Sequence, residues 1–167
     1  KKSKKYELGL LRPDGQPGFT SPTGKVEFVS ETLKKYGFNG LPVWNEPVQS
    51  PVATPDVAKD YPIILNTGSR LPMFTHSKQR HVPWLRALMP DPIVRIYPTD
   101  AEARGIVEGD WVYVSTQLGE IKARAEVTKM VKPGCMDMFH GWSQANVNEL
   151  VSRDFDPISG FPPYKEG

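Results

Sequence analysis

The stretch from Asp110 to Thr128, with the sequence DWVYVSTQLGEIKARAEVT, predicts a β-hairpin. From Glu120 onward, apolar and charged residues alternate strictly, which is typical of a strand with one buried and one solvent-facing side. Leu118 and Gly119 form the turn between the two strands. We therefore expect a mainly β domain that contains this hairpin.

Two short apolar runs outside the hairpin predict further strands. Residues 63–65 form a continuous run, as in a strand buried on both faces, and small polar residues break this strand from Asn66 to Arg70. Residues 93–97 predict a second buried strand, and residues 135–140 predict another one after a Pro-Gly pair.

Helices are expected to be short, because the chain has 17 prolines in 167 residues and proline does not fit a helix interior. They are predicted over residues 31–36, 81–89 and 101–104. Ser30 would cap the first helix, Pro83 lies in the first turn of the second, and Gly105 ends the third.

The chain is expected to divide at residue 60. Residues 1–60 are predicted to be an extended arm or connector, partly disordered in isolation, and residues 61–167 to be the compact domain. Within the arm, residues 23–29 predict a short strand. Residues 41–60 hold four prolines and no helix signal.

Two segments of the compact domain look alike. Residues 106–110 and residues 130–134 share an apolar beginning and a glycine that enters a strand. They are either two ordinary turns or the two halves of a barrel with internal pseudo-symmetry.

Composition excludes several classes of protein. The formal net charge of +2 does not suggest a nucleic-acid binder, and the lysines among the first five residues are typical of a solvated terminus. The single cysteine, Cys135, allows no internal disulfide and no cysteine-ligated iron–sulfur cluster from this chain alone. No run of 18 apolar residues is present, so no membrane contact is expected.

Motifs of self-sufficient catalysis are missing from the sequence. There is no Walker loop, no Gly-x-Ser-x-Gly elbow and no Gly-x-Gly-x-x-Gly run. His76 and His81 are five residues apart, which does not match a metal-ligand spacing, so no protein-only metal site is predicted. Since no initiator Met or signal peptide begins the chain, we expect a fragment of a longer polypeptide and not a complete enzyme; the compartment stays open.

The polar segment from Asn66 to Arg70 is the main candidate for a binding site. Small residues at the end of a buried strand leave backbone N–H groups free for an anion, and the Arg70 guanidinium suits a phosphate. Residues 76–80 would supply further donors. The alternative is an ordinary polar surface loop.

Asp100 and Asn148 are further candidates. A carboxylate such as Asp100 can accept two hydrogen bonds from the edge of a guanine, although Thr99 or Asp100 can also simply cap the helix that follows. Asn148 can both donate and accept hydrogen bonds, as a pterin edge requires, or can merely begin a helix.

The order of these motifs resembles the molybdopterin dinucleotide-binding domain of the dimethyl sulfoxide reductase family over residues 61–165, and weakly over residues 23–27. The resemblance is carried by Thr67-Gly68-Ser69-Arg70, His76-Ser77, residues 96–101, residues 105–112, Gly119, Pro133-Gly134, Gly141-Trp142, residues 148–150 and residues 156–160. Phe74-Thr75-His76-Ser77 and His140-Gly141-Trp142 look closest to the polysulfide or thiosulfate reductase branch.

This resemblance implies a six-stranded double-psi β-barrel with short flanking helices. It implies molybdopterin guanine dinucleotide as the cofactor, two copies of which would hold molybdenum or tungsten in a full-length enzyme that performs two-electron redox chemistry. The remaining domains of that enzyme, and electron-transfer subunits, would be the partners, and the protein ligand of the metal would lie outside this chain. By position, Thr67–Arg70 would face the pterin and pyrophosphate, His76, Ser77 and Asn148 the pterin, Asp100 a guanine, and Lys165 the cofactor from the tail.

The sequence departs from the family at two positions. The family often has Thr-Gly-Arg where this chain has Thr-Gly-Ser-Arg, so Arg70 can be displaced by one position, and Val151 stands where Thr is common. A second function also remains open, because double-psi barrels serve elsewhere as peptide- or protein-binding modules without redox chemistry.

Overall fold

The computed structural model describes residues 14, 16 and 18–162 of the chain. Residues 1–45 and residues 46–167 form two compact units, which are described separately. The lysines at the start of the chain and Lys165 lie outside the described residues, as does most of the first part of the predicted arm. The division at residue 60 and the partial disorder of the arm stay predictions.

The first unit contains one short helix, α2 (Glu31–Lys35), which confirms the prediction for this segment. The Ser30 side chain caps it by accepting a hydrogen bond from the Leu33 N–H at 3.2 Å. Gly37 follows the helix with a φ of +82°, a left-handed backbone that glycine adopts without steric cost.

The strand predicted over residues 23–29 was wrong. The segment forms turns and bends, and the Glu27 carboxylate accepts hydrogen bonds from both the N–H and the hydroxyl of Thr23. These contacts are local, because no neighbouring strand in the described part of this unit offers a ladder to residues 23–29.

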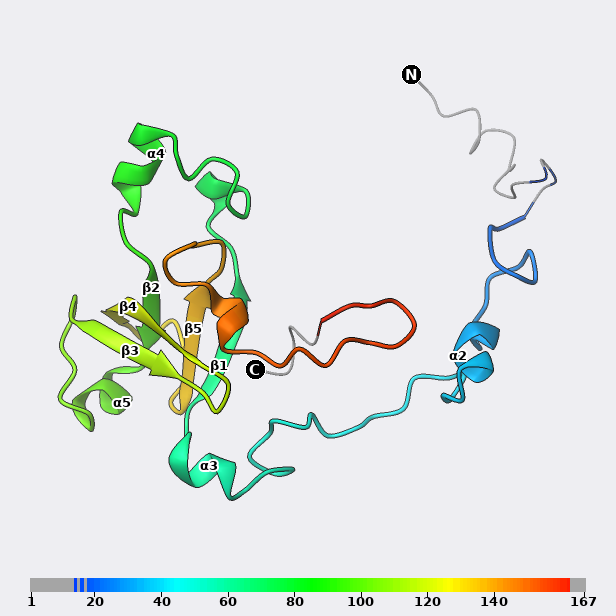
Figure 1. Ribbon diagram of the computed structural model, residues 1–167, viewed down its shortest axis with the longest axis horizontal. Helices are drawn as coiled ribbons and strands as arrows, with labels where there is room; N and C mark the ends of the chain where they lie inside the picture. Colours follow the sequence, from blue (N-terminus) through cyan, green and yellow to red (C-terminus); the bar gives the residue numbers. More distant parts are fainter. Residues whose placement is uncertain (1–13, 15, 17, 163–167) are drawn as a thin grey trace. The chain divides into compact units, whose positions relative to one another are not determined.

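The second unit is built on one mixed sheet of five strands in the order β1-β5-β2-β4-β3 (Figure 1). β1 pairs with β5 and β2 pairs with β4 in parallel, whereas β2 pairs with β5 and β3 pairs with β4 antiparallel. The mainly β class is thereby confirmed. The strands are β1 (Ile64–Ser69), β2 (Ile93–Ile96), β3 (Trp111–Ser115), β4 (Glu120–Val127) and β5 (Cys135–Phe139).

The hairpin predicted between Asp110 and Thr128 is present as β3 and β4. Val112 pairs with Ala123, and Ser115 pairs with Glu120 beside the turn. Burial alternates along β4 as the sequence pattern predicts, so the apolar side of the strand faces the core and the charged side faces solvent.

Strand β1 differs from its prediction in two ways. It is not buried on both faces, because Ile64 on one face is 46% exposed while Leu65 on the other face is buried. The strand also does not break at Asn66 but continues to Ser69. Polar residues continue this strand because Asn66 and Ser69 bind a carboxylate on the neighbouring strand β5.

Short helices flank the sheet, as expected. α4 (Pro83–Leu88) and α5 (Pro98–Glu102) each begin at a proline, whose missing N–H costs nothing at a helix start. Residues 41–60 were expected to lack a helix, but they end in the one-turn helix α3 (Val57–Asp60), beside which Lys59 pairs with Asp56 at 2.7 Å. Two 3₁₀ turns, η1 (Pro72–Phe74) and η2 (Val147–Glu149), complete the described elements.

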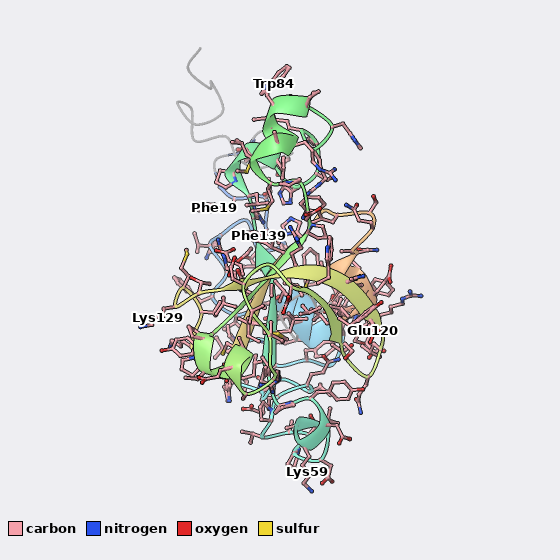
Figure 2. All side chains as sticks on the ribbon, turned by 90° about the vertical axis from the view of Figure 1, so that its left-hand side faces the viewer. Phe19, Lys59, Trp84, Glu120, Lys129 and Phe139 are labelled. Carbon is pink, nitrogen blue, oxygen red and sulfur yellow. The ribbon has the colours of Figure 1, made fainter. Side chains whose placement is uncertain are left out.

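The core combines buried side chains from all five strands with side chains from the segments that follow β1 and β5. Trp142, Phe74 and Met138 are its largest fully buried side chains, and none is more than 2% exposed. Figure 2 shows the side chains on the ribbon, with Trp84 and Lys59 at opposite ends of the view and Phe139 between them. In the described ranges, no helix has the length and apolar character needed to cross a bilayer.

Met138 tests the position of this core. Replacing it with alanine removes a side chain with 0% exposure and is expected to lower the free energy of unfolding by about 2–5 kcal/mol, measured by urea denaturation. Met130→Ala is the matched control, because Met130 is 72% exposed and its loss should cost less than about 0.5 kcal/mol. Equal effects of the two substitutions would contradict this placement of the core.

Candidate functional site

The strand directions bring three distant segments to one edge of the sheet. β1 and β5 are parallel and therefore end at the same edge, and β2, which is antiparallel to β5, begins there. We call this end of the strands the carboxyl edge, because it holds the carboxyl ends of β1 and β5. It differs from the two lateral edges of the sheet, which are formed by β1 and β3. Figure 1 shows α4 and the residues that follow β5 beyond one end of the sheet, and α5 beyond the other.

Most of the predicted site residues gather at the carboxyl edge. Thr67, Gly68 and Ser69 lie in the last part of β1, and Arg70 follows them directly. His76 and Ser77 lie in the turns after η1. Asn148 lies in η2, which follows β5 and whose next residue, Leu150, accepts a hydrogen bond from Thr116 in the β3–β4 turn at this edge.

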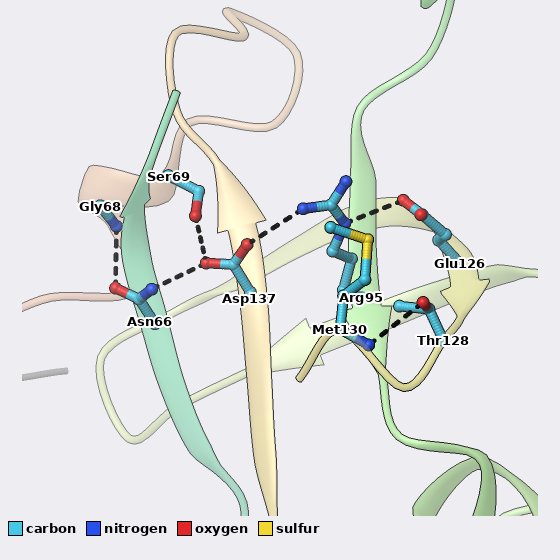
Figure 3. Close-up of polar contacts among 8 residues, drawn as sticks. All are labelled: Asn66, Gly68, Ser69, Arg95, Glu126, Thr128, Met130 and Asp137. Atoms are coloured by element: carbon cyan, nitrogen blue, oxygen red, sulfur yellow. Dashed lines mark hydrogen bonds and ion pairs between the residues drawn. The ribbon is translucent and has the colours of Figure 1, made fainter. Parts of the chain in front are cut away.

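The Asp137 carboxylate organises the end of β1. It is 7% exposed and accepts hydrogen bonds from Asn66 Nδ2 at 2.8 Å and from the Ser69 hydroxyl at 2.6 Å (Figure 3). Its second oxygen lies 3.8 Å from Arg95 Nη1, and Arg95 also donates to Glu126 at 3.1 Å. One buried carboxylate thus connects β1, β5 and β2, with its charge compensated as buried charges require.

The polar groups of the Thr67–Arg70 segment are less available to a ligand than the sequence suggested, because most of them are buried or already hydrogen-bonded within the protein. Asn66 pairs with Asp137 and Ser69 with Phe139, so β1 carries one extra residue there, as in a β-bulge. The Gly68 N–H donates to Asn66 Oδ1 at 3.1 Å, and Thr67 is buried. Arg70 is exposed and, within residues 18–162, has no hydrogen-bond or ion-pair partner. Arg70 is therefore the residue of this segment that is most available to a ligand.

Asp100 does not join this group. It lies in α5, which follows the carboxyl end of β2. Its Oδ2 accepts a hydrogen bond from the Gly134 N–H at 2.7 Å. Gly134 precedes β5, so this bond lies at the edge opposite the carboxyl edge. The carboxylate does not cap its own helix either, because the N-cap residue of α5 is Tyr97 and no side-chain hydrogen bond caps this helix.

His76 and His140 form a pair that the sequence did not predict. His76 Nδ1 lies 2.8 Å from His140 Nε2, and the ring centres are 4.9 Å apart. At this distance one ring donates a hydrogen bond and the other accepts it, so the neutral pair is satisfied and a doubly protonated pair is not. In the described part of the chain no third His, Cys, Asp or Glu joins them to form a metal cluster.

Burial and nearby cations lower the pKa of His140. Burial is the largest cause, followed by the neighbouring His76, while a hydrogen bond to the Ser69 main chain acts in the opposite direction and Arg70 and Arg80 lower the pKa further. The site therefore favours a neutral imidazole at His140.

This shift predicts a pH dependence of stability. The pKa of His140 is lower in the folded than in the unfolded chain, so the unfolded chain binds its proton first as the pH falls. Stability is then lost from about pH 6.5 downward, through the lowered folded pKa. In urea unfolding at pH 7.5 and pH 5, His140→Gln should lose less stability on acidification than the wild type, whereas the exposed control His81→Gln should behave like the wild type. The same acid loss in both variants would contradict the assignment.

Gly141 allows the loop that contains His140 to lie close to the loop that contains His76. It has a φ of +93°, and a Cβ built there would lie 2.8 Å from the His76 carbonyl oxygen and 3.2 Å from Arg80 Nη2. Backbone atoms cannot move away from such a contact as a flexible side chain can. Glycine is therefore needed both for the left-handed backbone and for the close approach.

Alanine substitutions separate these two requirements. Gly134→Ala introduces only the left-handed strain, about 1–2 kcal/mol, because nothing lies within 4 Å of the added Cβ. Gly141→Ala adds the contact with the His76 carbonyl and should cost roughly 1–3 kcal/mol more in thermal or urea unfolding. Equal costs would mean that the loops do not approach each other as described.

The segment between β1 and the end of α4 brings positive charge to the carboxyl edge. Residues 61–90 contain no Asp or Glu, and their four basic residues are Arg70, Lys78, Arg80 and Arg86. The segment after β5 contains no acidic residue before Glu149. This edge combines positive charge with histidine, serine and asparagine side chains, which suits an anionic ligand with many hydrogen-bonding atoms.

Fold and site together define a small mainly β binding domain with a cationic, polar edge. Residues 63–167 match the family model described as the molydopterin dinucleotide binding domain, and the chain belongs to this family. This match confirms the resemblance on which the prediction of a cofactor-binding domain rested. It also disfavours the alternative of a peptide-binding module.

Similar proteins support the same assignment. The chain is 35% identical to dopamine dehydroxylase of Eggerthella lenta over 172 residues, which cover 93% of the chain and 17% of that protein. It is 33% identical to acetylene hydratase of Syntrophotalea acetylenica over 77% of the chain and 18% of that protein. The solved structure of acetylene hydratase from Pelobacter acetylenicus matches with a TM-score of 0.79 and 28% identity, over 92% of this chain and 24% of that one. The chain thus spans about a fifth of the length of these relatives.

Sequence reasoning missed Asp137 and the role of His140, and it placed Arg80 among the donors for a ligand, whereas Arg80 is buried and donates to main-chain carbonyls. Asp137 carried one usable signal, since it is a lone carboxylate within the otherwise apolar strand CMDMF. Arg80 and His140 carried none, because their contacts join residues 60 positions apart.

Proposed function

We propose that the carboxyl edge binds the pterin and pyrophosphate of molybdopterin guanine dinucleotide. The observation that carries this proposal is the absence of carboxylates from residues 61–90, which leaves the exposed Arg70 and Lys78 to face a polyanion without a competing acidic side chain in this segment. Membership of the dinucleotide-binding family supports the ligand class.

The residues at this edge fit such a group. The exposed Arg70 guanidinium can hold a phosphate oxygen pair, and the exposed Lys78 adds a mobile charge on the same loop. His76, Ser77 and the Asn148 side chain are exposed and offer both donors and acceptors, as the edges of a pterin need. Thr67, Gly68 and Ser69 would then act mainly by shaping the strand end, because their polar groups are buried or already bonded.

Asp100 and Lys165 have separate places in the proposal. Asp100 would meet a guanine only if the ligand extends to the opposite edge, where its carboxylate already accepts the Gly134 N–H. Lys165 would approach the cofactor from the tail. Both roles stay predictions.

The six-stranded double-psi barrel is proposed as the finer form of this fold. It is supported by the two edge strands of the sheet, since Ile64 and Leu65 of β1 line the same cavity as Val114 and Ser115 of β3. A sheet whose two lateral edge strands line one cavity is curled toward closure. Residues 61–167 would form the barrel domain, in line with a family match that begins at residue 63.

In the whole protein, this domain would hold the cofactor for a molybdenum- or tungsten-dependent oxidoreductase. The bound group would supply two-electron redox chemistry, and this chain would bind it, orient it and exclude water. The other domains of that protein, and electron-transfer subunits, would be the partners. The polysulfide or thiosulfate reductase branch stays a prediction.

Titration with phosphate compounds tests the site. Inorganic pyrophosphate and GDP should shift the ¹H–¹⁵N resonances of Arg70, His76 and Ser77 at millimolar concentration. Arg70→Gln should weaken pyrophosphate binding about tenfold, the equivalent of about 1.4 kcal/mol, because it removes one charge-assisted contact.

The matched control is Arg104→Gln, an equal change of charge beside Asp100 at the opposite edge, which should change the affinity less than about twofold. Shifts confined to Asp100 and Gly134 would move the ligand to the other edge. Equal weakening by both variants would reduce the binding to nonspecific charge attraction and contradict the proposal.

A further inference from the structure

Arg80 is a buried cation between two aromatic rings. Its side chain is 4% exposed, and its guanidinium carbon lies 3.7 Å from the Trp142 ring centre and 4.5 Å from the Phe74 ring centre. The two rings are perpendicular, with their centres 6.1 Å apart. Stacking on two rings stabilises a guanidinium that has lost most of its water.

The hydrogen bonds of Arg80 join two separate loops. Nη2 donates to the His76 carbonyl oxygen at 3.4 Å and to the His140 carbonyl oxygen at 3.3 Å. Among the described residues, Nε and Nη1 are buried and have no partner. One nitrogen therefore provides all the hydrogen-bonding contact of this side chain, and it binds the backbone of both residues of the histidine pair.

The environment of Arg80 is costly for its charge. Burial, and then the nearby Arg86, lower the pKa of Arg80 to about 10. The group still carries its charge at neutral pH. No carboxylate in the described part of the chain pairs with it, so the side chain is not explained as half of a salt bridge.

We propose that Arg80 is a positioning residue of the carboxyl edge, which ties the backbone of His76 to that of His140 and thereby sets how the two imidazoles face each other and the ligand. The proposal rests on the proposed function only for the identity of that ligand. Arg80 does not touch the ligand itself, because its remaining nitrogens are enclosed by protein.

Backbone geometry around His76 agrees with such a tie. Thr75 and His76 have φ values of +43° and +66°, which non-glycine residues adopt only where surrounding contacts hold them. The His76 carbonyl is held by Arg80, and Gly141 allows the facing loop to lie close to it. Removing the guanidinium would free this carbonyl and let residues 75 and 76 relax.

Arg80 also acts on the pair through its charge. The charged or titratable groups that act on His140 are His76, Arg70 and Arg80, and no carboxylate is among them. Each of these groups disfavours a second proton on the pair, and Arg80 contributes the least of the three. Loss of Arg80 should therefore both loosen the two rings and ease the protonation of His140.

The test uses ligand-free protein and three variants. Arg80→Met keeps the length of the side chain but removes the charge and the hydrogen bonds, and Arg80→Lys keeps the charge while losing the planar contact with both carbonyls. Arg86→Met is the matched control, because Arg86 also lies over Trp142, at 4.9 Å, but donates to Pro90 and to neither histidine carbonyl.

The readout is the titration of the His76 and His140 ring resonances by NMR at a temperature where each variant is folded. In Arg80→Met the pKa of His140 should rise toward that of a free histidine, Arg80→Lys should give a smaller rise, and Arg86→Met should match the wild type. An unchanged His140 titration in folded Arg80 variants would overturn the proposal. Failure of both Arg80 variants to fold, with Arg86→Met folded, would make Arg80 a core residue only and would also overturn it.

A pyrophosphate titration then separates this inference from the proposed function. Arg80→Lys should weaken pyrophosphate binding several-fold if the pair is correctly placed only with Arg80 present. If pyrophosphate does not bind the wild type, while Arg80 still controls the His140 titration, the proposed ligand is wrong and the positioning role stands.

Discussion

The buried carboxylate of Asp137 is the interaction on which the rest of the carboxyl edge depends. It lies in the central part of the sheet, accepts hydrogen bonds from Asn66 and Ser69 on β1, and faces Arg95 on β2. A buried charge without such partners would be strongly destabilising, so the polar end of β1 and the charge on β5 require each other. Because this network holds β1 beside β5 up to Ser69, Arg70 leaves the sheet at a defined place.

A second set of contacts builds the edge beyond the strands. Arg80, stacked on Phe74 and Trp142, joins the loop after β1 to the loop after β5. The two sets of contacts differ in their central charge, which is the buried carboxylate of Asp137 in the sheet and the buried guanidinium of Arg80 between the loops. An approaching polyanion therefore meets Arg70, Lys78 and neutral donors on the loop after β1, while the carboxylate of Asp137 is engaged by Asn66, Ser69 and Arg95.

Local patterns predicted much of this fold and less of its site. The β3–β4 hairpin, the strand at residues 93–96, and helices α2 and α4 follow from alternation, caps and prolines, which act between near neighbours. The strand at residues 23–29 failed because a local bond between Thr23 and Glu27 replaced a ladder that has no partner. The break predicted at Asn66 failed because the partner of its side chain lies 71 residues away.

The sequence alone determined a mainly β domain with short helices, a hairpin at residues 110–128, and polar residues suited to an anionic ligand at Arg70, His76 and Ser77. Only the tertiary structure decided that Asp100 lies at the opposite edge, that His76 meets His140, and that Arg80 holds both loops. The physical reason is that alternation and capping depend on residues close along the chain. Which residues share an edge depends instead on the parallel or antiparallel direction of each strand pair, which no local pattern encodes.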